Sequence, residues 1–584
     1  MRSNPARISG VFAVLGIILF SAYAGPAMAS QIPPGQDVGS LQRTTEETKK
    51  TESVTKGLIE GGKKAEIENA GAVAPKQAAE AAKASESKVL IAKIEVDGVT
   101  VIPPDVIRSV VAPYEGKELS LSDFKIAADA VNDEYRRRGY VTTLVYLPPQ
   151  KIENGILKIA VVEGKVGVIN LTGNRYFTRD LIMSYIDLKQ GDLFNYDVLR
   201  KDVNNVNEHP DRNAKIVLEK GAGAGETDVN IQLKDRMPIH ATVGYNNYNS
   251  SYLGRNRYSV ELKENNMFGI DHVASVEAQL GDDDHYHLYS GRYLMPITPR
   301  NKVGVYYVNV DQKLGGSVKN LNIEGRGNIA AIYDSYKLID HDDFVMRINP
   351  EFDYKDIKNK MLGLTLSEDN VRVAKLGFDF DFTDRFGGRS LLTQEFDYGI
   401  PGFMGGLEAK DSKASSAGSG GKFFKSVTNA ARIQTLPASA SIMIRGSGQI
   451  TNNNLVSTEQ FNLGGPATVR GYPISELNGD QGIAGTAEVY IPPYFIPTKP
   501  TIPGTDLKYF NATKIVAFFD WGRVWRNNAQ VGEAKTEEIY SAGPGLRFDI
   551  PNRFSFSFDY GFALGQKPSD GSKGRGLVET KIFF

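Results

Sequence analysis

Cysteine is absent from the 584 residues, and histidine is scarce. Cys 0 excludes disulfide frameworks, thiolate metal sites and cysteine nucleophiles together, and His 6 leaves few imidazoles for catalysis. The net charge is only -1, so the chain lacks the basic excess typical of nucleic-acid-binding proteins. After residue 29, no stretch approaches the roughly 18–20 unbroken apolar residues that a membrane-spanning helix needs. Helical membrane transporters are therefore excluded, and no nucleic-acid partner is expected.

Common catalytic motifs are also missing. The chain has no Gly-x-Ser-x-Gly elbow, no Gly-x4-Gly-Lys-[Ser/Thr] phosphate loop and no His-Glu-x-x-His zinc helix. The run from Asp282 to His287 could bind a cation, but its position in an expected outer loop favours a solvated charge run. We therefore expect no enzyme activity, no cofactor and no metal site.

The N-terminus has the pattern of an export signal. Arg2 and Arg7 precede the apolar run Val11 to Phe20, and Ala27-Met28-Ala29 supplies the small residues that a signal peptidase accepts. The run is too short to span a membrane, so cleavage after Ala29 is favoured over an uncleaved anchor. An exported chain without cysteine points to the envelope of a Gram-negative bacterium, either the periplasm or the outer membrane.

Residues 30–87 contain no aromatic residue and few large apolar side chains. Within residues 30–56, the stretch Leu41 to Thr55 has good helix formers and allows Glu46 to pair with Lys49 and Lys50. Because this helix has almost no apolar stripe, it can persist only in solvent or in a water-filled cavity. Simple disorder is the alternative. Residues 57–87 are expected to form a linker.

From residue 88 the same order of elements is expected twice. Residues 88–163 predict a strand, two helices and two strands, and residues 164–236 repeat that order. Each opening strand is followed by a turn of matching placement, at Gly98 in the first copy and Gly173 in the second. Two tandem βααββ domains are therefore favoured over one larger α+β domain. The expected elements are 89–96, 103–111, 121–138, 141–147 and 156–163, then 166–171, 178–186, 196–208, 214–219 and 227–234.

Residues 237–584 alternate between apolar and polar side chains. From Phe554 to Phe562 one face is wholly aromatic, while the other carries Ser555, Ser557, Asp559 and Gly561. Carboxylates also alternate with aromatic residues over 378–382 and 392–398, and they would be strongly desolvated inside a soluble sandwich. A membrane barrel instead turns the apolar face to lipid and the polar face to a hydrated lumen.

The number of such segments predicts a closed antiparallel barrel. Sixteen strands are expected, an even number, with short turns at one end and long polar loops at the other. The abundance of turn-forming and aromatic residues, Gly 59, Tyr 27 and Phe 28, agrees with many short strands. The expected strands are 239–248, 256–264, 272–280, 286–294, 302–311, 327–335, 344–355, 371–382, 389–399, 422–434, 438–450, 483–491, 513–521, 538–549, 553–563 and 576–584.

Two motifs give the chain a family resemblance. The sixth long loop contains Val469-Arg470-Gly471-Tyr472, and the next upward strand contains Phe518-Phe519-Asp520-Trp521-Gly522. With the paired βααββ units, these motifs make the chain resemble the two-partner secretion transporters (TpsB), relatives of the outer-membrane insertases. The resemblance implies that the βααββ units are POTRA domains and that the loop tip folds back into the barrel. It also implies that Arg470 meets Asp520, next to Phe518 and Gly522.

The residues themselves are compatible with such an anchor. Asp520 shares a strand face with Phe518 and Gly522, opposite Phe519 and Trp521, so it should point inward. An arginine fork can hold a carboxylate bidentately, which suits a long loop entering a hydrated pore. The alternatives are an exposed loop arginine at 470 and a lumen-solvating charge at 520.

The resemblance also implies partners. An unfolded exoprotein of the β-helical adhesin or haemolysin class would bind the POTRA domains and leave through the barrel without nucleotide hydrolysis. Residues 30–56 match the plug helix of that family in position and polarity. The terminal residue Phe584 resembles the signal that the barrel assembly machinery recognises, and lipid and lipopolysaccharide would surround the barrel. A barrel assembly insertase is the alternative function, and a passive porin is a third.

Overall fold

The computed structural model describes residues 33, 35–60, 66–69 and 88–584. The predicted signal peptide and most of the predicted linker lie outside these residues. Two compact units form the chain, one from residues 62–238 and the other from residues 239–584 with the N-terminal segment up to residue 61. Within the described ranges, no helix is both long enough and apolar enough to cross a membrane.

The first part of the 62–238 unit packs two helices against short strands. Its elements are β2 (Val89–Ile91), β3 (Lys93–Asp97), α3 (Pro104–Val111), β4 (Lys117–Leu119), α4 (Leu121–Arg137), β5 (Leu144–Tyr146) and β6 (Ile156–Val162). Ser120 caps helix α4: its hydroxyl accepts from the Asp123 backbone N–H, while the Asp123 carboxylate accepts from the Ser120 N–H. Strands β3, β6 and β5 form one sheet, and β2 pairs with β4.

The second part again has a strand, two helices and two strands. These are β7 (Lys165–Thr172), α5 (Arg179–Met183), α6 (Tyr196–Asn207), β8 (Arg212–Lys220) and β9 (Glu226–Asp235). Thr178 and Asn195 cap the two helices through their side-chain oxygens. Each part has its own buried cluster, centred on residues such as Val131 and Ile159 in the first and Val203 and Ile216 in the second.

The segment expected to be a linker, residues 57–87, contains regular structure in the two parts that are described, residues 57–60 and 66–69. Strand β1 (Glu66–Asn69) adds to the second sheet by pairing in parallel with β8, giving the order β1-β8-β9-β7. Helix α2 (Val38–Glu60) runs past the expected end at residue 56. The linker expectation is therefore wrong for residues 57–60 and 66–69, because pairing with a sheet edge orders a short polar strand that its own composition does not predict.

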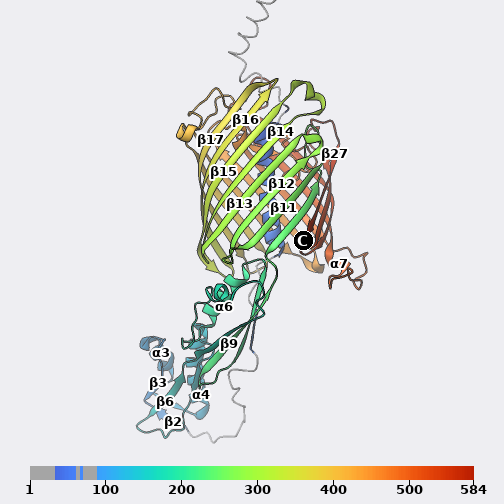
Figure 1. Cartoon of the computed structure of the whole chain (residues 1–584). Helices are drawn as coiled ribbons and strands as arrows, with labels where there is room; N and C mark the ends of the chain where they lie inside the picture. Colours follow the sequence, from blue (N-terminus) through green and yellow to red (C-terminus); the bar gives the residue numbers. More distant parts are fainter. Residues whose placement is uncertain (1–32, 34, 61–65, 70–87) are drawn as a thin grey trace, which may run out of the picture. The chain divides into compact units, whose positions relative to one another are not determined.

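The second unit is a closed antiparallel barrel (Figure 1). Its sixteen strands follow one another around the wall, and β27 pairs with β10 to close it. The strands are β10 (Ile239–Asn246), β11 (Arg257–Met267), β12 (His272–Gly281), β13 (Tyr286–Thr298), β14 (Asn301–Lys313), β15 (Glu324–His341), β16 (Phe344–Met361), β17 (Leu364–Thr383), β18 (Arg389–Gly399), β19 (Phe423–Thr435), β20 (Ser441–Thr451), β23 (Gln481–Ile491), β24 (Thr513–Trp525), β25 (Thr536–Ile550), β26 (Phe554–Ala563) and β27 (Gly574–Phe583).

The wall turns its apolar side chains outward. Val260, Ile332 and Phe519 are about half exposed on the outside, whereas Lys425 and Asp520 are fully buried on the inside. A polar face turned inward is the reverse of a soluble β-sandwich and is the arrangement of a barrel that spans a membrane.

Three strands are longer than expected. β15, β16 and β17 contain 18, 18 and 20 residues, and only Leu362 and Gly363 separate β16 from β17. The sequence pattern predicts that β16 ends at residue 355 and that β17 begins at residue 371. Charged residues continue the ladder between these points, as in the ion pair of Lys358 with Glu368, so the amphipathic signal fades while the pairing continues.

Candidate functional site

The connection between β20 and β23 is a loop that lies inside the barrel. It contains a small hairpin of β21 (Phe461–Leu463) and β22 (Leu477–Gly479). Phe461, Leu463 and Tyr472 of this loop pack against Val524 and Ile539 of the wall. Loops normally run over the surface, so this burial requires specific polar contacts for the loop backbone and its charges.

Arg470 at the loop tip contacts the wall through an arginine fork. Its Nε donates to Asp520 Oδ2 at 2.9 Å and its Nη2 donates to Asp520 Oδ1 at 2.8 Å. The Arg470 backbone N–H also donates to Asp520 Oδ2, at 3.1 Å. Both residues are buried, with Arg470 2% and Asp520 0% exposed. The two sequence-predicted residues thus form a buried, bidentate ion pair.

The other residues of the two motifs shape the seat of this arginine. The Phe518 ring lies under the guanidinium, 3.4 Å from its carbon to the ring centroid. Gly522 leaves room for loop residue Leu463, whose Cδ2 would lie 2.5 Å from an added Cβ. On the loop, a Cβ at Gly471 would meet the backbone N of Ala563 at 2.9 Å. Glycine is therefore required at 471, where the loop backbone meets the wall backbone, and a side chain at 522 would displace Leu463.

The loop tip also contacts the connection between β26 and β27. The Tyr472 hydroxyl donates to the Gln566 carbonyl at 2.8 Å and accepts from the Gly565 N–H at 3.1 Å. Val469 is fully buried in the apolar cluster beneath the tip. All four residues of the Val469–Tyr472 motif are therefore buried against the wall.

Two further carboxylates complete the arginine site. Glu488 of β23 lies 2.7 Å from Arg470 Nη1, and Asp559 of β26 lies 3.4 Å from the same atom. Each carboxylate has a second arginine, because Arg445 pairs with Glu488 at 3.4 Å and Arg547 pairs with Asp559 at 2.9 Å. Alternation along residues 554–562 predicts Asp559 on the polar, lumen-facing side, but these contacts could not be predicted because they depend on the path of the loop.

A second buried charge site lies near the base of the same loop. Glu459 is fully buried and pairs with Lys355 Nζ of β16 at 2.9 Å and with Lys425 Nζ of β19 at 2.7 Å. Arg43 of α2 lies 4.0 Å away, at the limit of an ion pair. Lys425 also lies 3.5 Å from Asp397 of β18. Sequence reasoning missed this site, since no motif marks Glu459.

Helix α2 lies inside the barrel beside this loop. The Asp37 carboxylate accepts from the Ser40 N–H at 3.0 Å and begins the helix. Asn462 of the loop donates to the Ser40 carbonyl at 3.2 Å, and the hydroxyl oxygens of Thr44 and loop residue Ser475 lie 2.6 Å apart. Farther along the helix, Lys50 lies 3.9 Å from Glu395 of the wall. Polar contacts thus hold much of the helix, as expected for a helix with almost no apolar stripe, while Val38, Leu41 and Leu58 are buried in apolar clusters.

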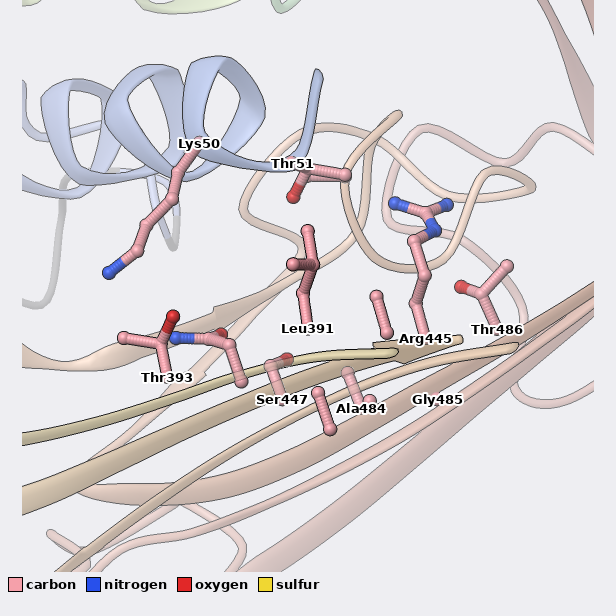
Figure 2. A pocket seen from close by; sticks show the side chains of 14 residues that line it. Lys50, Thr51, Leu391, Thr393, Arg445, Ser447, Ala484, Gly485 and Thr486 are labelled. Carbon is pink, nitrogen blue, oxygen red and sulfur yellow. The ribbon is translucent and has the colours of Figure 1, made fainter. Parts of the chain in front are cut away.

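The helix leaves a cavity between itself and the wall. This cavity has a volume of about 70 Å³ and is lined by Lys50 and Thr51 of α2 and by residues of β18, β19, β20 and β23. Figure 2 shows both helix side chains pointing toward the wall, above Leu391, Thr393 and Arg445. The helix therefore leaves a small unfilled space on this side of the lumen.

The remaining sequence candidates lie away from this site. The terminal residue Phe584 has an exposed side chain, and its backbone pairs with Ala241 of β10, with the Phe584 N–H donating to the Ala241 carbonyl at 2.8 Å. The Asp282–Asp284 run forms a short turn between β12 and β13. In the part of the chain that the structure describes, no group of three or more histidine, cysteine, aspartate or glutamate residues is arranged to hold a metal ion.

Comparisons with known proteins agree with this architecture. A family model described as "POTRA domain, ShlB-type" matches residues 89–164, and one described as "Haemolysin secretion/activation protein ShlB/FhaC/HecB" matches residues 225–548. The heme/hemopexin transporter protein HuxB of Haemophilus influenzae is 24% identical over 78% of this chain and 79% of its own length. The outer membrane transporter CdiB of Escherichia coli is 23% identical over 67% of each chain.

Solved structures show the same fold. CdiB from Escherichia coli superposes with a TM-score of 0.73 and 17% identity, covering 93% of this chain and 98% of that chain. CdiB from Acinetobacter baumannii gives 0.65 and 14% identity, covering 93% and 99%. The ShlB model spans more than half of the chain. The chain belongs to the haemolysin secretion/activation protein ShlB/FhaC/HecB family and is an outer-membrane protein secretion pore of the TpsB type, with its POTRA domain in the periplasm.

Proposed function

We propose that the chain captures an unfolded exoprotein in the periplasm and passes it through the barrel after the lumen is cleared. The observation that carries this proposal is the nature of the obstruction. Helix α2 and the sixth loop occupy the lumen. Ion pairs and hydrogen bonds hold their charged and polar groups, and small apolar clusters bury Val38 and Leu41 of the helix and Leu463 and Val469 of the loop. The polar contacts can exchange with water when the lumen is cleared, so only the small apolar clusters lose burial.

The domain layout of the proposal follows the sequence expectations. Residues 1–29 are a signal peptide, 30–56 begin a plug helix that α2 continues to Glu60, and the chain after Glu60 leads to the periplasmic part, where β1 joins the second sheet. Residues 88–163 and 164–236 are two POTRA domains, and 237–584 form the transmembrane barrel. The plug is a polar helix that must leave the lumen before a client chain can enter.

Matching glycines support a second POTRA domain. Gly98 follows β3 with a φ of +88°, and Gly173 follows β7 with a φ of +82°. A Cβ on either residue would lie 2.2 Å from a strand carbonyl, that of Val161 in the first part and that of Leu233 in the second. The same steric demand at the same step of the βααββ order is what a duplicated domain would have.

The two buried charge sites have separate roles in the proposal. Arg470 and Asp520 anchor the tip of the sixth loop to β24, and the Val469–Tyr472 and Phe518–Gly522 motifs shape that seat. Glu459 anchors the base of the loop to β16 and β19 and carries a charge that faces Arg43 of the helix. Glu459 is therefore shared by the loop and the helix. Departure of the helix removes the Arg43 charge from Glu459 and so changes the electrostatic interactions that hold the loop.

The chain acts as a conduit and not as an enzyme in this proposal. No nucleotide is hydrolysed, and folding of the client outside the cell drives transport. The client is a TpsA-like exoprotein of the β-helical class, which the POTRA domains bind by strand addition. Outer-membrane lipid and lipopolysaccharide surround the barrel, and the assembly machinery recognises the terminal Phe584 during biogenesis.

Deletion and complementation separate secretion from barrel assembly. Cells that lack this chain should retain the client in the periplasm and lose it from the medium, while the amounts of other outer-membrane barrels stay unchanged. The intact chain should restore secretion. A loss of other barrels with normal client secretion would instead support an insertase and would refute the proposal.

A further inference from the structure

One connection at the entry end of the barrel is much longer than its neighbours. Residues 492–512, here called the rim segment, join β23 to β24, whereas residues 436–440 and 551–553 make the adjacent turns at the same end. The rim segment ends in the short helix α7 (Tyr509–Ala512). In Figure 1 α7 and the coil leading to it project sideways from the lower rim of the barrel.

The rim segment is tied to both neighbouring turns. The Tyr494 hydroxyl donates to the Ala438 carbonyl on one side, and Arg553 Nη1 donates to the Gly504 carbonyl at 2.8 Å on the other. Within the segment, the Ile502 N–H donates to the Leu507 carbonyl at 2.8 Å. These bonds fix the segment along the rim and do not leave it as a free loop.

This fixed segment presents aromatic side chains to its surroundings. Phe495 is 75% exposed, Tyr494 61% and Tyr509 37%. Tyr509 stacks on Phe548 of β25 with ring centroids 6.4 Å apart, and Phe548 in turn contacts Phe554 of β26 at 6.2 Å. Tyr509 is therefore continuous with the outward face of neighbouring strands, and Tyr494 contacts Phe510, the residue after Tyr509, with ring centroids 6.3 Å apart.

Charge and composition indicate which partner covers this surface. Two exposed lysines, Lys499 and Lys508, flank the aromatic residues, against one acid, Asp506. Aromatic rings beside basic side chains, placed where lipid-facing strands end, match the membrane–water interface, where tyrosine reaches the headgroups and phenylalanine enters the acyl region. A protein partner would not require continuity with the lipid-facing wall.

We propose that the rim segment is a lipid-binding collar that lies on the periplasmic leaflet of the outer membrane. Phe495 inserts into the acyl region, the two tyrosines lie among the headgroups, and the lysines face lipid phosphates. The collar would fix the depth in the bilayer of β23 and β24, the two strands that supply Glu488 and Asp520 to the Arg470 site. This inference rests on the outer-membrane location and is independent of the plug proposal.

Because the chain contains no cysteine, a single introduced cysteine can carry a nitroxide probe. Phe495→Cys is labelled in the full chain, reconstituted in vesicles of phosphatidylethanolamine and phosphatidylglycerol. Collisions with oxygen, which concentrates in the bilayer, are compared with collisions with a water-soluble nickel chelate. Phe519→Cys on the lipid-facing wall is the apolar control, and Val531→Cys in an exposed loop at the opposite barrel end is the aqueous control.

The collar predicts an oxygen-to-nickel ratio at 495 several-fold above that at 531 and close to that at 519. A ratio equal to that at 531 would place the segment in water and overturn the proposal. Low collision rates with both reagents would show that protein covers Phe495, which also overturns it. If position 519 itself gave the aqueous ratio, the outer face of the wall would not contact lipid, and the collar proposal would be overturned together with the membrane assignment.

Discussion

Replacing Arg470 with alanine tests how strongly the sixth loop is held in the lumen. The substitution removes both arms of the fork to Asp520, which is fully buried and would keep only the Ser541 hydroxyl at 3.2 Å, apart from main-chain contacts. Removing one partner of a buried ion pair typically costs about 3–5 kcal/mol. Glu488 and Asp559 retain Arg445 and Arg547, so we expect the lower limit, about 3 kcal/mol.

A cost of this size should release the loop measurably. Three kcal/mol lowers the docking equilibrium by roughly a hundredfold, since about 1.4 kcal/mol corresponds to a factor of ten. Hydrogen exchange of loop peptides from residues 461–479, followed by mass spectrometry in proteoliposomes, should therefore accelerate by about that factor if the loop undocks without global unfolding. Client secretion should fall in the same variant.

Two controls make the result specific. Arg470→Lys keeps the charge but loses the fork, so its exchange should be intermediate. Arg389→Ala removes an arginine that pairs with Asp381 beside the turn between β17 and β18, away from the loop, and it should leave loop exchange unchanged. Unchanged exchange and secretion in Arg470→Ala would refute the anchor role.

Two further predictions concern the second charge site and the periplasmic unit. Glu459→Gln leaves Lys355 and Lys425 without their shared buried carboxylate, so loop and helix should be held less tightly. The single-channel conductance in planar bilayers should then rise. Unchanged conductance would contradict a role of Glu459 in holding both the loop and the helix. The 62–238 unit has its own cores, and burial raises the pKa of Asp202 in it to about 6, above the unfolded value. The folded unit therefore binds the Asp202 proton more tightly than the unfolded chain does. This contribution to the free energy of unfolding is present at low pH and is lost as the pH rises through 6. Compared with Asp202→Asn, the parent unit should lose about 2 kcal/mol of unfolding free energy between about pH 4.5 and about pH 7.5, measured by urea unfolding. Parallel pH profiles would contradict this.

Much of the barrel could be predicted from the sequence because the lipid outside the wall and the hydrated lumen inside it select apolar and polar side chains respectively. The alternation from Phe554 to Phe562 predicted a strand that the structure has as Phe554–Ala563. The same rule shortened β16 and β17, because beyond residue 355 both faces carry polar residues and alternation no longer marks the strand. Strand β1 was missed because its order comes from the edge of β8.

The site was predictable only as far as motifs reach. Arg470 and Asp520 stood in recognisable patterns, and strand parity alone placed Asp520 on the lumen face. The pairs of Glu488 with Arg470 and of Glu459 with Lys425 can be placed only when register and loop path are known, because the partners lie on different elements and no motif marks Glu488, Glu459 or Lys425. Long-range charge pairing is therefore information that the fold adds to the sequence.

A reversible lock on the helix tests the central claim most directly. The hydroxyl oxygens of Thr44 and Ser475 are 2.6 Å apart, so Thr44→Cys with Ser475→Cys places two sulfurs close enough for a disulfide in a chain that has no other cysteine. Client secretion is then measured in oxidised cells and again after reduction, with each single cysteine variant as control. The account predicts that the oxidised double variant blocks secretion and that reduction restores it. Normal secretion through a barrel whose helix is verifiably cross-linked to the loop would contradict the account.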